Sequence, residues 1–349
     1  MDIKGVCYDT GRAYSSWFVT RQRFDPAATR RDLQVIRDDL HANAVRFQGT
    51  DITRLITAAT DALHLGLQVW LSPELFGKSQ QATITNLVKA ATAAEPLQQR
   101  HPGQLTFCVG TEASLFTSGI VPGRTVNQRV AQIRETGPRS GTYTAPLQTF
   151  LAEATTQVRK VFHGPLTYAA LPIEDVDWSM FDVIGVDLYR KFTNDDRYRE
   201  TLRRYLQSGL QSGLQSGLRS GKPVVNAEFG HTANEAAQPD MTEFGDVDTL
   251  SVWLHRRAGR LVRPRLKQKT YTRNEHHQAR ELTTTLSILD TEGAAGAFIW
   301  TFADPWLPHS ADPRRDLDVT SSALVKTHAD GTTWEPKEAF KTVASFYAG

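Results

Sequence analysis

Acidic side chains in this sequence repeatedly end or follow short apolar runs that read as strands. The polar and aromatic residues at these positions are Asp9, Arg46, Glu74, Glu112, Glu174, Asp187, Tyr189, Glu228 and Trp300. If the strands are parallel, all of these side chains converge at one end of the sheet. Two carboxyl groups from different strands can then divide acid and nucleophilic work, because their environments can keep one protonated and the other ionised. Hydrolysis of a glycosidic bond needs such a pair.

The other residue types in this set narrow the chemistry. An arginine beside a carboxylate keeps that carboxylate ionised, and Arg46 could act in this way. An indole ring such as that of Trp300 offers a flat apolar surface to the C–H face of a sugar. The set contains no histidine-rich cluster with metal-ligand spacing, and the chain has no Gly-x-Ser-x-Gly motif. We therefore expect no metal site, no cofactor and no serine nucleophile.

The elements that position these residues alternate along the chain. Strand-like apolar runs are predicted at 3–8, 43–47, 67–71, 105–109, 165–170, 181–189, 223–227 and 294–300. Helical spacing of apolar residues predicts helices at 26–40, 52–65, 83–93, 147–162, 197–205, 277–289 and 338–348, with Gly66 as a stop signal for the second. Buried strands that alternate with helices are typical of parallel sheets. The sequence therefore predicts an α/β protein with a single (β/α)8 barrel domain over residues 1–349. A doubly wound open sheet is the rival, but no Gly-x-Gly-x-x-Gly follows any strand.

Two segments interrupt this alternation. Residues 207–221 contain a tandem Gln-Ser-Gly-Leu repeat, and because glycine disfavours helix we expect a surface loop there. Residues 231–274 form a long connection after the seventh strand, on the face of the barrel where loops carry function. This connection contains a basic run over residues 256–269. The run is either a solvated face or a recognition surface for an anionic substituent of the substrate.

Composition excludes several classes of protein. The 349 residues are 40% hydrophobic, enough for a substantial core. Lys and Arg number 40 against 38 for Asp and Glu, a net charge of +2 that argues against a nucleic-acid partner. No signal peptide and no apolar stretch long enough to span a membrane is visible. We expect a cytoplasmic protein, although a chain trimmed of a leader would read the same. The only two cysteines, Cys7 and Cys108, lie in apolar runs and are expected to be buried thiols.

Six segments together resemble a known clan of enzymes. In chain order they are Val45-Arg46-Phe47, Val109-Gly110-Thr111-Glu112, the segment 176–189, the segment 223–230, Ala297-Phe298-Ile299-Trp300 and the segment 334–340. They resemble motifs of the retaining (β/α)8 glycoside hydrolases, whose acid/base ends the fourth strand and whose nucleophile ends the seventh. More narrowly, the chain resembles little-characterised bacterial barrels labelled abortive infection proteins, a label that implies no chemistry.

The resemblance implies a role for each matching residue. Glu112 would be the general acid/base, and Glu228 the nucleophile that forms a covalent glycosyl-enzyme. Arg46 and Tyr189 would hold Glu228 ionised, and Trp300 would form the floor of the sugar subsite. Asp9, Glu74 and Glu174 are weaker candidates for substrate contacts.

Two positions depart from the clan. Thr111 stands where the clan usually has an asparagine that contacts the 2-hydroxyl of the sugar, and Asp187 stands where several families have a histidine. Both departures leave the identity of the sugar open, and the oligomeric state is open as well. The leading hypothesis is a retaining glycosidase that acts on a β-linked glycoside. A transglycosylase or small-metabolite-tailoring enzyme on the same barrel and a non-catalytic sugar-binding barrel are the alternatives.

Overall fold

A computed structural model gives the structure of the chain. It describes residues 1–15, 17–136, 141–190, 195–215, 221–234, 247–258, 264–267 and 271–349. Among these residues, no helix is long and apolar enough to cross a membrane. Cys7 and Cys108 are both buried free thiols, as predicted.

Eight parallel strands close into a barrel. In chain order they are β1 (Ile3–Gly11), β4 (Ala44–Gly49), β5 (Gln68–Pro73), β6 (Leu105–Thr111), β7 (Leu166–Ala170), β8 (Ile184–Val186), β9 (Val224–Phe229) and β10 (Gly296–Ile299). Each strand pairs with the next, and β10 closes the ring on β1 with Gly296 opposite Ile3. The predicted (β/α)8 barrel is therefore confirmed.

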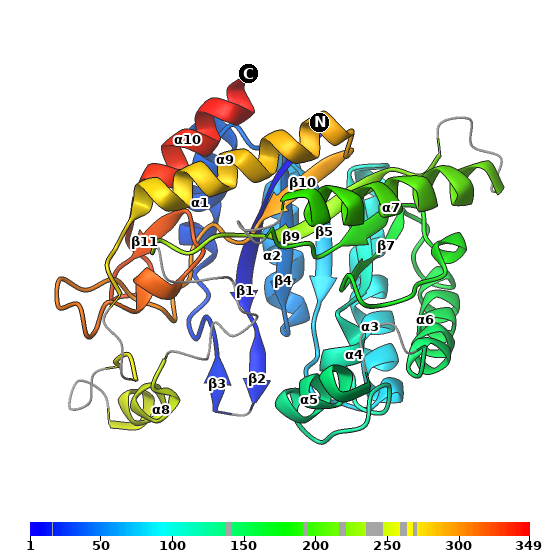
Figure 1. The fold of residues 1–349 in the computed structure, drawn as a ribbon, viewed down its shortest axis with the longest axis horizontal. Helices are drawn as coiled ribbons and strands as arrows, with labels where there is room; N and C mark the ends of the chain where they lie inside the picture. Colours follow the sequence, from blue (N-terminus) through cyan, green and yellow to red (C-terminus); the bar gives the residue numbers. More distant parts are fainter. Residues whose placement is uncertain are drawn as a thin grey trace.

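Helices surround the barrel and pack their apolar faces on it (Figure 1). They are α1 (Pro26–Asp38), α2 (Ile52–His64), α3 (Gln80–Arg100), α6 (Thr144–Arg159), α7 (Asp195–Gln215), α9 (Glu275–Glu292) and α10 (Glu338–Ala348). The capping signals in the sequence act as expected. The Asp25 carboxylate accepts the backbone N–H of Ala27 at the start of α1, and Gly66 takes a positive φ of 80° just beyond α2.

The connection from β7 to β8 has a short 3-10 turn, η1 (Trp178–Met180), in place of an α-helix. Lys222 stabilises this turn through hydrogen bonds to its carbonyl oxygens. Its buried Nζ donates to the carbonyl oxygens of Trp178 at 2.7 Å and Phe181 at 2.6 Å. The lysine thereby satisfies carbonyl groups that a longer helix would have bonded internally.

Several short elements gather at the end of the barrel where the strands finish (Figure 1). They are the hairpin of β2 (Ala13–Ser15) and β3 (Phe18–Val19), with α4 (Ala113–Phe116), α5 (Val126–Thr136) and α8 (Thr249–Ala258). The two chain termini lie at the other end (Figure 1). A 3-10 turn, η3 (Leu317–Thr320), and the pair β11 (Val325–Thr327) and β12 (Trp334–Pro336) lie between β10 and α10.

The glycine repeat was wrongly predicted to be a loop over 207–221. Residues 207–215 continue α7, whereas 216–220 lie outside the described residues. The glycines allow a close approach that any side chain would block. A Cβ on Gly209 would lie 2.8 Å from the carbonyl oxygen of Lys222, and one on Gly213 would lie 2.2 Å from the Cα of Gly221. Packing against the chain that leads into β9 therefore outweighs the low helix propensity of glycine.

The long connection after β9 is only partly irregular. Its described part contains the helix α8 and an isolated bridge that pairs Val247 with Leu266. Most of the basic run at 256–269 lies outside the residues whose side chains are described. Arg265 is described, and it forms an ion pair with Asp248 at 3.2 Å.

The glycine contact predicts that a change from glycine to alanine in α7 destabilises the protein, although alanine has the higher helix propensity. Gly213→Ala should lower the free energy of unfolding by about 1–3 kcal/mol, because the added methyl group overpacks the contact with Gly221. The matched control is Gln211→Ala on the exposed side of the same helix, which should change it by less than about 0.5 kcal/mol. Urea denaturation measures both. A stabilised Gly213→Ala protein would show that helix propensity, and not packing, governs this site.

Candidate active site

Arg46 is fully buried at the end of the barrel where the strands finish. It lies at the centre of a polar layer, which consists of the side chains of Arg46, Ser72, Thr111, Asp187 and Glu228. Its donors reach four other strands or their ends. Nε donates to the Ser72 hydroxyl at 3.1 Å, Nη2 to the Thr111 hydroxyl at 2.9 Å and Nη1 to the carbonyl oxygen of Ala227 at 2.8 Å. Nη1 also lies 3.3 Å from Asp187 Oδ1. One guanidinium group thus links β4 to β5, β6, β8 and β9.

Glu228 extends from β9 into this layer and keeps 14% of its side chain exposed. Both of its oxygens have donors. Oε1 accepts from the Tyr189 hydroxyl at 2.8 Å, and Oε2 accepts from Gln48 Nε2 at 3.1 Å and lies 3.5 Å from Arg46 Nη1. Two neutral donors and one cation stabilise a negative charge on this carboxyl group. Such a carboxylate is suited to act as a nucleophile.

Glu112 directly follows β6 and has the opposite surroundings. Burial raises the pKa of its carboxyl well above the usual range, and the negative charges of Asp187, Glu228 and Glu174 raise that pKa further. Its backbone has φ 44° and ψ 49°, in the left-handed region that only one other described non-glycine residue adopts. A protonated carboxyl group next to an ionised one is the arrangement expected of an acid/base and a nucleophile.

Asp187 is a third carboxyl group at this centre. It follows β8, is 2% exposed and pairs with Arg46. Burial raises its pKa well above the usual value against the opposing effect of Arg46. When Asp187 is ionised, its negative charge raises the pKa of Glu112.

Glu74 is linked to Glu228 through one amide. Gln48 Nε2 donates to Glu74 Oε1 at 3.0 Å and to Glu228 Oε2 at 3.1 Å, so both of its protons are used. Burial raises the pKa of Glu74 to about 7, although the charges of Arg12 and Arg46 lower it. Gln48 was not among the residues predicted for the site, because the predicted strand stops at residue 47. Gln48 lies two residues after Arg46 and therefore points to the same side of β4.

Four further buried residues lie in or just beyond β1 and β10, namely Asp9, Arg12, Trp300 and Asp304. Asp9 lies in β1, and its Oδ1 accepts from the backbone N–H of Gly11 at 2.7 Å. The guanidinium of Arg12 lies 4.2 Å from the ring centre of Trp300, which is 2% exposed. Burial raises the pKa of Asp304, just beyond β10, to about 6. Arg12 thus covers one face of the indole ring that was expected to form the sugar floor, so the role of Trp300 stays a prediction.

The Glu174 carboxyl group is already occupied by hydrogen bonds to neighbouring residues. One of its oxygens accepts from the backbone N–H and the hydroxyl of Ser114, and the other accepts from the Tyr168 hydroxyl and the N–H of Leu171. The two oxygens therefore already accept four hydrogen bonds. A supporting role follows more directly from this geometry than a substrate contact.

The structure thus brings most of the predicted residues to one place. Arg46, Thr111, Asp187, Tyr189 and Glu228 form one connected group through the contacts above. Glu74 joins it through Gln48, and Glu112 joins it through charge. Asp9 lies in β1 and Trp300 directly after β10. Glu174 instead binds Ser114, two residues after Glu112.

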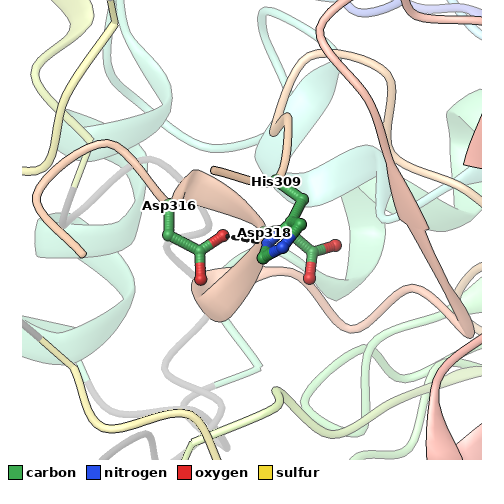
Figure 2. Close-up of side chains that lie close together, drawn as sticks. All are labelled: His309, Asp316 and Asp318. Carbon is green, nitrogen blue, oxygen red and sulfur yellow. Dashed lines mark hydrogen bonds and ion pairs between the residues drawn. The ribbon is translucent and has the colours of Figure 1, made fainter. Parts of the chain in front are cut away.

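A separate cluster has the residue types of a metal site. His309, Asp316 and Asp318 lie on the segment after β10 and point toward one another, with ligand atoms within 4.8 Å (Figure 2). Arg273 already supplies a cation to it, since Nη2 lies 2.8 Å from Asp316 Oδ2 and 2.9 Å from Asp318 Oδ2. The buried Nζ of Lys337 lies 3.0 Å from the other oxygen of Asp318. We therefore assign no metal to this cluster.

Comparisons with known proteins bear on the fold. No protein-family model and no curated protein matches the chain. Among solved structures, the chain is similar to a GH113 β-mannanase from Alicyclobacillus acidocaldarius, with 15% identity, a TM-score of 0.57 and coverage of 99% of this chain and 97% of that one. Another GH113 β-1,4-mannanase has 15% identity, a TM-score of 0.58 and coverage of 100% and 99%. A β-glucuronidase from Ruminococcus gnavus has 13% identity and a TM-score of 0.58, and the match covers 99% of this chain but 50% of that one.

At these identities the similarity shows a shared fold. The architecture of the chain is that of barrels that occur in glycoside hydrolases. The narrower resemblance to proteins labelled abortive infection stays a prediction.

Glu74 gives a test of the site through stability. Its folded-state pKa of about 7 lies above the ordinary 4.5, so ionisation costs the folded state stability as pH rises from about 4.5 through about 7. Glu74→Gln removes this cost and keeps an acceptor for Gln48. The unfolding free energy of the variant minus that of wild type should increase by about 2–3 kcal/mol from about pH 5 to about pH 8.

Urea denaturation at the two pH values measures this difference, with the exposed Glu200→Gln as control. A difference between Glu74→Gln and wild type that does not change with pH would contradict the assignment of Glu74 as a carboxyl group held neutral by burial.

Proposed function

We propose that the protein is a retaining glycoside hydrolase that acts on a β-linked glycoside through a covalent glycosyl-enzyme. The observation that carries the proposal is the contrast between Glu112 and Glu228. Burial and the neighbouring carboxyl groups raise the pKa of Glu112 well above its usual range, while Tyr189, Gln48 and Arg46 surround the Glu228 carboxylate with donors. Glycoside hydrolysis needs one carboxyl group in each state.

In the first step, a Glu228 oxygen attacks the anomeric carbon as the bond to the leaving oxygen breaks. Glu112 transfers its proton to that oxygen, so the leaving group departs as a neutral alcohol. Glu228 loses its negative charge as its ester forms, and the hydrogen bonds that it accepts from the Tyr189 hydroxyl and Gln48 weaken. Arg46 keeps its pairing with Asp187 throughout and holds the strand ends in place.

In the second step, Glu112 is an ionised base. It removes a proton from a water molecule, which attacks the anomeric carbon and breaks the ester to Glu228. Glu112 is then protonated again and Glu228 is again a carboxylate, so the cycle closes with retention of configuration.

The fold similarity guides the choice of sugar. The solved barrels of similar fold include β-mannanases and β-glucuronidases. We therefore place β-mannosides and β-glucuronides in the first rank of candidates for this chain. The chain's own departures at Thr111 and Asp187 lie beside the reacting carboxyl groups, so other β-glycosides belong in the panel.

Release of nitrophenol from a panel of aryl β-glycosides, with α-L-arabinofuranosides included, tests the proposal. Wild type should cleave at least one member. Glu112→Gln should lower kcat/KM on a poorly leaving phenol by roughly 10²–10⁴-fold, because the general acid is gone. Glu228→Gln should lose at least as much on every substrate. The exposed Glu200→Gln is the matched control and should keep the wild-type rate.

Two outcomes would overturn the proposal. The first is a wild-type rate in Glu228→Gln. The second is sugar binding by calorimetry without release of any aglycone, which would favour a barrel that binds without cutting. Transfer to added sugar acceptors with no hydrolysis would instead identify a transglycosylase that uses the same carboxyl pair.

A further inference from the structure

The backbone at Glu112 is held in a conformation that it would not adopt unaided. Its left-handed φ of 44° is unfavourable for a residue that carries a side chain. The chain then enters α4, only four residues long, whose first N–H groups need partners outside the helix. Whatever satisfies those groups also fixes the direction of the Glu112 side chain.

Two side chains from the next strand and its loop supply the partners. The Tyr168 hydroxyl accepts the N–H of Ala113 at 2.7 Å. The Glu174 carboxylate accepts the N–H of Ser114 at 2.9 Å and its hydroxyl at 2.6 Å. Tyr168 and Glu174 are joined to each other, since the Tyr168 hydroxyl donates to Glu174 Oε2 at 2.8 Å.

The same tyrosine also fixes the chain before Glu112. Gly110 has φ 151°, and a Cβ there would lie 3.3 Å from Tyr168 Cε2. The ring therefore packs against the backbone two residues before Glu112, while its hydroxyl binds the residue after it. Tyr168 is fully buried and Glu174 is 9% exposed, so water does not readily replace either contact.

We propose that Tyr168 and Glu174 are positioning residues that hold the strained turn at Glu112 and thereby aim its carboxyl group at the leaving oxygen. This inference rests on the proposed function, because it assigns Glu112 the role of general acid. Without the Tyr168 hydroxyl, Ala113 loses its acceptor and the backbone at Glu112 relaxes toward negative φ, which turns the side chain away. The charge of Glu174 has a second effect, since it contributes to the raised pKa of Glu112.

Leaving-group dependence separates positioning of the acid from a general structural role. A dinitrophenolate departs without a proton, whereas an alkyl or sugar alcohol needs one from Glu112. With the sugar that the aryl panel identifies, Tyr168→Phe should lower kcat/KM for a methyl or sugar aglycone by about 10-fold or more. For the dinitrophenyl glycoside it should change it by less than about 3-fold.

Tyr347→Phe is the matched control. Its hydroxyl is also buried and donates to the carbonyl oxygen of Gly5 at 2.8 Å, in a part of the barrel remote from Glu112. It should leave the ratio between the two substrates unchanged. Equal losses on both substrates in Tyr168→Phe, or no loss on either, would overturn the inference.

A second measurement needs no substrate. Carbon-13 NMR titration of the carboxyl groups, with the Glu112 signal assigned from its absence in Glu112→Gln, should show a lower Glu112 pKa in Glu174→Gln than in wild type. The sign follows from the loss of a neighbouring negative charge. An unchanged Glu112 pKa would contradict the coupling.

Glu112→Gln measured with the same two glycosides separates this inference from the proposed function. If Glu112→Gln shows no selective loss on the poor leaving group, the proposed function is wrong. If it shows that loss and Tyr168→Phe does not, only the positioning role is wrong.

Discussion

The polar layer of this barrel depends on one buried cation. A guanidinium group removed from water costs several kcal/mol unless it is fully paired, and Arg46 is fully buried. Its pairing is spread over Ser72, Thr111, Asp187 and the carbonyl oxygen of Ala227. Each partner comes from a different strand or its end, so the charge can be satisfied only when these strands are in register. The requirement that stabilises Arg46 therefore also brings the ends of β6, β8 and β9 together around Glu112 and Glu228.

From this arrangement follows the division of charge between the two glutamates. Glu228 is close enough to Arg46 to form an ion pair and has two further donors. Glu112 lies among carboxyl groups, and the charges of Asp187 and Glu228 rank directly after burial among the causes that raise its pKa. The same negative charges that would destabilise an ionised Glu112 are tolerated because Arg46 neutralises part of them. A single cation thus supports one carboxylate and leaves the other to be protonated.

The left-handed turn at Glu112 adds a second constraint. Strain of this kind persists where surrounding contacts over-determine the backbone. Here those contacts are the hydroxyl of Tyr168 and the carboxylate of Glu174, and both are buried. Glu228 lies instead inside β9, where the pairing with β8 ends at Asn226 and the register with β10 shifts between Asn226 and Phe229.

Much of this architecture was accessible from the sequence, and the reasons are specific. Arg46, Glu112 and Glu228 were found because each ends an apolar strand, where a charged residue is conspicuous. Gln48 was missed because the predicted strand ended at residue 47, two residues before the end of β4 at Gly49. Tyr168 was read as part of an apolar run, and nothing in the sequence shows that its hydroxyl meets Ala113 and Glu174 across the turn. The repeat at 207–215 was misread because its glycines serve a packing contact with residues 221–224 that local propensity does not reveal.

The proposed mechanism depends on a covalent bond between Glu228 and the sugar, and mass spectrometry of a trapped intermediate can detect this bond. Fluorine at the 2-position of a glycosyl fluoride slows both steps of the reaction, while the fluoride leaving group keeps the first step fast enough for the ester to accumulate. After incubation with such 2-deoxy-2-fluoro-β-glycosyl fluorides and proteolysis, we expect the added mass of one glycosyl group on the peptide that contains Glu228. Turnover of glycosides with no such adduct, or an adduct on a different carboxyl group, would contradict the proposed mechanism.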